Sequence, residues 1–133
     1  MTVSTDPHKK FRKELNSGIV SMVLLSIMSK AKEPMYGYQI AKNIEGKGES
    51  IPMMKQGALY PVLRSLAAAE LLKSHVDPSV TGPPRRYYQI TESGKQTLIQ
   101  WQSIWNETKN YIDDVLNNVF NNVSGNVLGD ENV

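Results

Sequence analysis

The chain has 133 residues, of which 40% are hydrophobic and 21% are charged, a size and composition that fit one globular domain and exclude large barrels and doubly wound folds. It contains no cysteine, so disulfides, thiolate nucleophiles and cysteine-based zinc sites are excluded and a cytoplasmic location is expected. Residues 1–90 carry 13 basic against 7 acidic side chains, a net charge of +6, and residues 91–133 carry 2 against 6, a net charge of −4.

A basic front followed by an acidic back is typical of a polyanion-binding module joined to a second functional part. The longest apolar run, Ile19 to Met28, is broken by two serines and is too short to span a bilayer, so no membrane segment is expected.

The first helix is predicted from Phe11 to Met28, with residues 1–9 as a flexible arm. Its apolar positions recur three or four residues apart, at Phe11, Leu15, Ile19, Met22 and Val23. After Pro34 the pattern indicates a short second helix, ended by Gly46 and Gly48. Its apolar stripe consists of Tyr36, Ile40, Ala41 and Ile44.

A third helix is predicted from Lys55 or Gln56 to Ala69, with Leu59, Leu63 and Leu66 facing inward. Pro61 lacks an N–H and disrupts a helix interior, but the donors of the first helical turn have no partner in any case. Pro61 therefore favours a late start for this helix.

Two short strands are predicted at Leu72–Val76 and Arg86–Ile90. The segment between them contains Pro78, Gly82, Pro83 and Pro84, which indicates a hairpin with a long loop. Thr91 is expected to cap a last helix that runs to about Val123, and the asparagine-rich residues 124–133 are expected to be a disordered tail.

The order helix, helix, helix, hairpin, long helix predicts a mostly α fold with a two-stranded β-wing. We interpret residues 1–90 as a winged helix-turn-helix domain and residues 91–123 as a long C-terminal dimerisation helix.

Three motifs in this order resemble the PadR-type transcriptional regulators. They are Met35–Ile40 (MYGYQI), Gly57–Arg64 (GALYPVLR) and Gly82–Gly94 (GPPRRYYQITESG). The resemblance implies a small winged-helix repressor that binds operator DNA as a homodimer. Two positions depart from the family pattern: Ala58 stands where threonine is usual, and Glu70 replaces the glycine that commonly ends the recognition helix. Because glycine gives an easy left-handed cap, the third helix is expected to end differently here.

The third helix is expected to enter the major groove of DNA. Its outward residues combine two cations for phosphate or guanine, an amide suited to adenine and a phenol for a phosphate oxygen. These candidate DNA contacts are Lys55, Gln56, Tyr60 and Arg64, and the prediction adds Tyr36. The alternative is a solvated face with Tyr60 packed on the domain.

Arg85 and Arg86 stand where the wing leaves its loop. Because adjacent strand residues point to opposite sides, one of the two is expected to contact a phosphate or the minor groove, and which one is left open. The alternative is a pair of charges that solvates the hairpin. Tyr87 and Tyr88 are expected to divide in the same way, one into the core and one outward.

The last helix carries a heptad seam, which a monomer of this size cannot cover and which therefore predicts a homodimer. The seam consists of Leu98, Trp101, Trp105, Thr108, Ile112, Val115, Val119 and Asn122. Trp101 and Trp105 lie one turn apart, so they either line a pocket for a small hydrophobic aromatic effector or form plain interface core.

An enzyme is not expected, because no nucleophile, paired-carboxylate, metal-ligand or phosphate-loop pattern surrounds His8 and His75, the only two histidines. The sequence therefore predicts a double-stranded-DNA-binding repressor of a pseudo-palindromic operator, without a cofactor. The rival interpretation is a winged-helix module that binds protein. A basic recognition face favours the first, and an apolar one the second.

Overall fold

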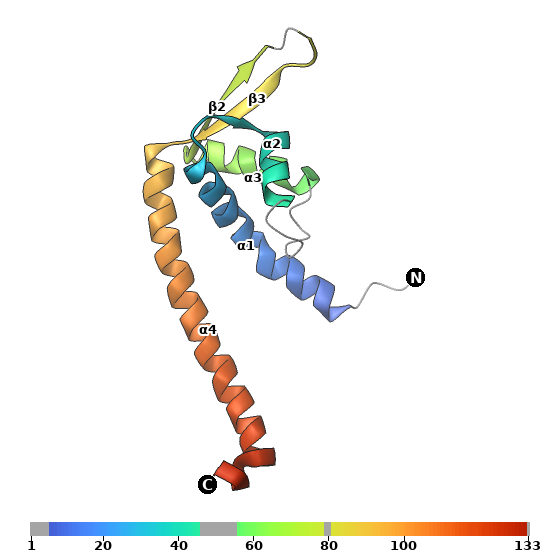
Figure 1. Cartoon of the computed structure of the whole chain (residues 1–133), viewed down its shortest axis with the longest axis vertical. Helices are drawn as coiled ribbons and strands as arrows, with labels where there is room; N and C mark the ends of the chain where they lie inside the picture. Colours follow the sequence, from blue (N-terminus) through green and yellow to red (C-terminus); the bar gives the residue numbers. More distant parts are fainter. Residues whose placement is uncertain (1–5, 46–55, 79–80, 133) are drawn as a thin grey trace. The chain divides into compact units, whose positions relative to one another are not determined.

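The computed structural model describes residues 6–45, 56–78 and 81–132. The chain divides into two compact units, residues 1–98 and residues 99–133. Within the described ranges, the first unit contains three helices and a small sheet, and the second consists of the continuation of one long helix (Figure 1).

Helix α1 spans Pro7–Lys30. It begins earlier than predicted, because the Asp6 carboxylate accepts a hydrogen bond from the His8 N–H at 2.9 Å and Pro7 suits the first helical turn. Residues 7–9 are thus helical, and the predicted arm is wrong for them. The predicted buried stripe is also wrong at its start, since Phe11 is 65% exposed; α1 reaches the core only through Val20, Leu24, Leu25 and Met28.

Strand β1 (Met35–Tyr36) precedes helix α2 (Gly37–Glu45). Tyr36 therefore lies in a strand, not in the helix to which the periodicity assigned it. The Gln39 side chain accepts a hydrogen bond from the Tyr36 N–H at 3.0 Å, as in a capping box. The rest of the predicted stripe is confirmed, because Ile40, Ala41 and Ile44 are buried.

Helix α3 spans Gln56–Ala68, with Leu59, Leu63 and Leu66 buried as predicted. Pro61 lies inside the helix, so the expected late start is wrong. A proline at the sixth helical position removes one backbone hydrogen bond close to the N-terminus, and burial of the leucine stripe more than offsets that loss.

The end of α3 keeps the geometry that glycine normally provides. Glu70 adopts a left-handed conformation with φ of 63°. Its N–H bonds to the Ala67 carbonyl at 2.9 Å, and the Leu71 N–H bonds to the Leu66 carbonyl at 3.0 Å, the pair of bonds that defines a Schellman motif. The expected different ending is therefore wrong, since the surrounding contacts hold a glutamate in a conformation it disfavours.

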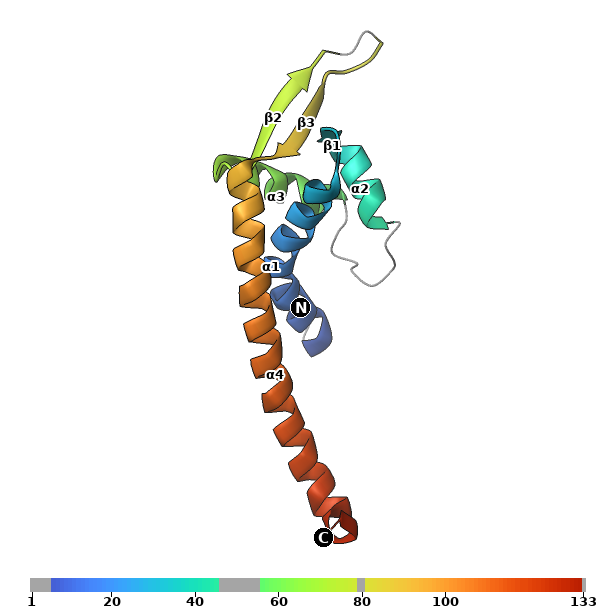
Figure 2. The same ribbon diagram turned by 60° about the vertical axis from the view of Figure 1, so that its left-hand side comes forward.

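Strands β2 (Leu72–Asp77) and β3 (Arg85–Ile90) form the predicted hairpin. β1 adds a third strand, in the order β1-β3-β2, with both pairings antiparallel. The predicted two-stranded wing is thus part of a three-stranded sheet. The hairpin projects beyond α2 and α3, and β1 lies against β3 near the base of the hairpin (Figure 2).

Helix α4 spans Glu92–Asn132. Thr91 caps it as predicted, because its hydroxyl oxygen accepts a hydrogen bond from the Gly94 N–H at 2.9 Å. The helix continues past Val123, so a disordered tail is wrong for residues 124–132. Once a helix is nucleated, each further residue adds a hydrogen bond at small cost, which carries the backbone through weak helix formers.

The mostly helical fold with a small antiparallel sheet and a long C-terminal helix agrees with the predicted fold class. Among the helices of the described ranges, none is long and apolar enough to cross a membrane.

Candidate nucleic-acid interface

A shallow cleft of about 350 Å³ lies between α3, the junction of β1 with α2, and the wing. Its lining contains three arginines and four tyrosines. The lining residues are Tyr36, Gly37, Tyr38, Tyr60, Arg64, Pro84, Arg85, Arg86 and Tyr88. Three stretches that are separate in the sequence, β1 with the start of α2, then α3, then the wing, thus bring cationic and phenolic side chains to one concave surface.

Tyr60 and Arg64 reach the cleft from α3, one turn apart on the same helix face. Both side chains are exposed. A Cβ on Gly37 would meet the Tyr60 ring, with the ring Cζ at 2.9 Å, so the absence of a side chain at position 37 lets the ring lie over the start of α2. Tyr60 thus lies against the start of α2 and also lines the cleft; its contact with DNA stays a prediction.

Two predicted contacts cannot be placed. Lys55 lies outside the described residues, and Gln56 is described only as the first residue of α3, without its side chain.

Both wing arginines line the cleft, so the expectation that only one of them faces this surface is corrected. Their side chains start from opposite faces of β3, but Arg85 extends over β1, where its guanidinium carbon lies 4.5 Å from the centre of the Tyr36 ring. The Arg86 guanidinium instead donates a hydrogen bond to the Ser74 hydroxyl of β2 at 3.0 Å.

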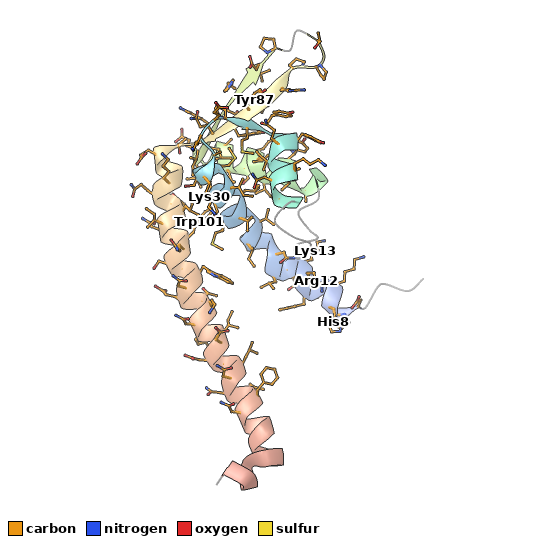
Figure 3. All side chains as sticks on the ribbon, in the orientation of Figure 1. His8, Arg12, Lys13, Lys30, Tyr87 and Trp101 are labelled. Carbon is orange, nitrogen blue, oxygen red and sulfur yellow. The ribbon has the colours of Figure 1, made fainter. Side chains whose placement is uncertain are left out.

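Tyr87 and Tyr88 divide as predicted. Tyr88 is 4% exposed in the core, and Tyr87 is half-buried on the other face of the sheet. There Tyr87 packs edge-on against Tyr36, with ring centres 5.4 Å apart, and parallel to His75, with centres 5.5 Å apart. Figure 3 shows Tyr87 on the hairpin, while Arg12 and Lys13 lie in the N-terminal half of α1.

The sequence did not mark Gly37, Tyr38, Pro84 and Tyr88 as lining residues of the cleft, nor Ser74 as the partner of Arg86. A glycine between two tyrosines in MYGYQI was a signal for close packing at position 37. No local pattern marks Ser74, because its role depends on the cross-strand register that places it diagonally from Arg86.

Comparison with known proteins decides the family. Residues 24–100, which contain α2, α3, the wing and the start of α4, match the Transcriptional regulator PadR-like family. The chain belongs to this family. It is a transcriptional regulator, as the three sequence motifs predicted, and membership places it among DNA-binding proteins and not among enzymes.

Individual PadR-like relatives agree with this assignment. The chain is similar to a PadR family transcriptional regulator from Eggerthella lenta, with 30% identity and a TM-score of 0.70, over 84% of this chain and 93% of that one. A transcriptional regulator from Clostridium thermocellum is 29% identical, with a TM-score of 0.67, over 76% of this chain and 96% of that one. An uncharacterized protein of Lysinibacillus sphaericus is 31% identical over 93 residues, 70% of this chain and 83% of that protein.

In this PadR-like chain α4 exposes large apolar side chains along the predicted seam. Leu98 and Trp101 are half-buried, while Trp105, Ile112, Val115 and Val119 are between 38% and 50% exposed. Further exposed apolar residues, which the seam did not include, are Ile99, Ile104, Tyr111, Leu116 and Phe120. The apolar surface is therefore wider than a two-residue heptad seam.

Across the described residues, no group of three or more histidine or acidic side chains is placed to hold a metal ion.

Proposed function

We propose that this PadR-like regulator is a sequence-specific repressor that binds a two-fold symmetric operator as a homodimer in the cytoplasm. One observation carries the proposal: Arg64 of α3 and Arg85 and Arg86 of the wing line the same cleft. Such a surface suits a strand of duplex DNA, with α3 in the major groove and the wing on the adjacent backbone.

The proposed roles follow residue type. Lys55 and Arg64 bind phosphates or guanine, and the wing arginines bind a phosphate or the minor groove. Tyr60 donates to a phosphate oxygen, and Gln56 reads adenine. The rival function, a protein-binding module, is less well supported. A protein-binding recognition face would be apolar, whereas Tyr60 and Arg64 make this one phenolic and cationic.

The width of the exposed apolar surface of α4 supports the homodimer. Apolar residues at two seam positions per heptad suit a two-stranded coiled coil, whereas this helix also exposes Ile104 and Tyr111 seven residues apart beside the seam. A surface of this width is buried when a helix packs against more than one neighbour. In a two-fold dimer, α4 and α1 of a second copy are both available for this packing, and α1 exposes Phe11 and Leu15.

Repression needs no surface beyond the DNA interface and the dimer, since occupying an operator blocks transcription directly. Trp101 and Trp105 at the proposed dimer interface suit a pocket for a planar aromatic effector that releases the DNA. Saturable quenching of tryptophan fluorescence by aromatic compounds tests this effector. If Trp101→Ala dissociates the dimer and no aromatic compound quenches the parent protein, the indoles are interface core only.

Footprinting on the DNA that flanks the protein's own gene tests the main proposal. We expect protection of two symmetric half-sites about one helical turn, ~34 Å, apart, with affinity that falls steeply as salt rises. Protection of a single asymmetric site, or binding that does not respond to salt, contradicts a dimer held by phosphate contacts.

A further inference from the structure

The two arginines of the wing are held in different ways. The Arg85 guanidinium lies over an aromatic ring, with its central carbon 4.5 Å from the centre of Tyr36, whereas Arg86 donates one of its N–H groups to Ser74 within the hairpin. A cation–π contact attracts the charge of the guanidinium and leaves N–H donors available for a phosphate. Among the described residues, no side chain accepts a hydrogen bond from Arg85.

The ring beneath Arg85 is itself fixed from several sides. Tyr36 pairs with Tyr87 across β1 and β3, and Tyr87 pairs with His75 across β3 and β2, so the three rings form a row over the sheet. The Tyr38 ring stacks on Tyr36 with centres 6.5 Å apart, and the Tyr36 N–H is bonded to the Gln39 side chain. Backbone pairing, a capping bond and two ring neighbours thus hold Tyr36 in place.

This row is a support and not a platform for nucleobases. The planes of His75 and Tyr87 differ by 10° and their centres lie 5.5 Å apart, so the two rings stack on each other. A platform for bases needs ring faces that are open to the ligand. At the β1 end of the row the guanidinium of Arg85 lies over the Tyr36 ring.

From this geometry we propose that Tyr36 is a positioning residue for DNA binding: it holds Arg85 over the cleft shared with Tyr60 and Arg64, with the guanidinium donors ready for a DNA phosphate. The inference rests on the proposed DNA-binding function and deepens it. A flexible arginine loses side-chain freedom when it binds, and a ring that restricts it beforehand reduces that loss. It also makes Arg85, rather than Arg86, the main phosphate contact of the wing.

A double-mutant cycle on the full chain tests the proposal, with a fluorescent 30-bp duplex of mixed sequence as the probe. Tyr36→Phe keeps the ring and is expected to bind within about twofold of the parent protein. Tyr36→Leu removes the ring and is expected to weaken binding about three- to tenfold. In the Arg85→Ala background Tyr36→Leu is expected to have no further effect, whereas with Arg86→Ala the two losses multiply.

Three outcomes overturn the inference. If Tyr36→Phe weakens binding as much as Tyr36→Leu, the hydroxyl contacts DNA itself. If Tyr36→Leu weakens binding equally with and without Arg85, the ring acts by another route. If the parent protein binds no duplex at any salt concentration, the proposed function fails and the inference fails with it. In the first two cases DNA binding stands and only the positioning role is lost.

If the Tyr36→Leu variant does not fold, a measurement on the free parent protein still tests the proposal. The Nε–H signal of Arg85, identified by its loss in Arg85→Ala, is expected in NMR spectra of the parent protein and of Tyr36→Phe to be displaced by the ring and to show a rigid side chain. A mobile Arg85 signal at its ordinary position in the parent protein overturns the proposal without any DNA.

Discussion

The hydroxyl of Thr91 donates a hydrogen bond to the carbonyl oxygen of Glu70 at 2.7 Å, and so joins the end of α3 to the start of α4. The hydroxyl oxygen of Thr91 also accepts a hydrogen bond from the Gly94 N–H at 2.9 Å, and the Thr91 N–H bonds to the Leu71 carbonyl at 3.1 Å. One side chain therefore caps the long helix and fixes the position at which the proposed recognition helix ends.

Replacing Thr91 with valine keeps the shape of the side chain and removes the hydrogen bonds of its hydroxyl with Glu70, Leu71 and Gly94. We expect the free energy of unfolding to fall by about 1–2 kcal/mol, since a helix cap is lost and a carbonyl loses its donor. Urea denaturation followed by circular dichroism measures this change. Thr91→Ser is the control and should keep most of the stability; equal stability of the valine and serine variants contradicts the role given to the hydroxyl.

Glu70→Gly is expected to stabilise the protein. Glu70 has a left-handed φ of 63°, a conformation that costs a residue with a Cβ about 1–2 kcal/mol. Glycine adopts this conformation freely, but it loses more chain entropy on folding. The net expected gain is about 1 kcal/mol in urea denaturation. Glu70→Ala removes the same carboxylate but keeps a Cβ, so it should bring no such gain. Equal stability of the two variants would show that φ at position 70 carries no cost.

Two glycines in helices should respond to alanine in opposite directions. At Gly94 an added Cβ meets the Leu71 carbonyl oxygen and lies 2.8 Å from the Ile90 side chain. Because backbone cannot move aside cheaply, Gly94→Ala should cost about 2 kcal/mol or more. At Gly18 nothing lies within 4 Å of an added Cβ, so Gly18→Ala should add up to about 1 kcal/mol through helix propensity. Thermal melting measures the stability of both variants. If both melting temperatures shift in the same direction, the predicted difference between the two positions is wrong.

Gly37→Ala is expected to act on DNA binding through Tyr60. The new Cβ would lie 2.8 Å from the Tyr60 hydroxyl oxygen and closer still to the ring, so the ring must leave its position in the cleft. The Kd for duplex DNA should rise about fivefold, the loss of one phosphate contact worth about 1 kcal/mol, with the circular dichroism spectrum unchanged. In a protein that already carries Tyr60→Ala, Gly37→Ala should not weaken DNA binding further. A further rise in Kd would show that Gly37→Ala does not act through Tyr60.

Glutamate at both Val115 and Val119 should dissociate the proposed dimer, because two charges would have to be buried at the apolar surface of α4. The matched control places glutamate at Asn117 and Asn121, which fall on the opposite side of the heptad pattern. Sedimentation equilibrium should give a monomer of 14.9 kDa for the first variant and twice that mass for the control. If the variant with glutamate at positions 115 and 119 remains dimeric, the interface lies on α1, where Phe11 and Leu15 are exposed.

Much of this protein was determined by the sequence itself, because the signals are local. The leucines of α3 repeat at helical spacing, prolines and a glycine separate β2 from β3, and Thr91 has the side chain that a helix cap needs. Three short motifs were also sufficient to predict the family. The charge difference between the two parts of the chain pointed to a polyanion-binding module before any residue was assigned a role.

The tertiary structure decided the features that depend on distant partners. Strand β1 has only two residues, too few for a periodic signal, and exists because β3 offers it an edge. Glu70 is left-handed against its own preference, because the Schellman bonds and the Thr91 hydroxyl hold that turn. Arg85 joins Arg86 at one cleft, despite the alternation of strand side chains, because its long side chain extends over β1 to an aromatic ring. Local preferences of about 1 kcal/mol yield to a fold whose packing is worth many times more.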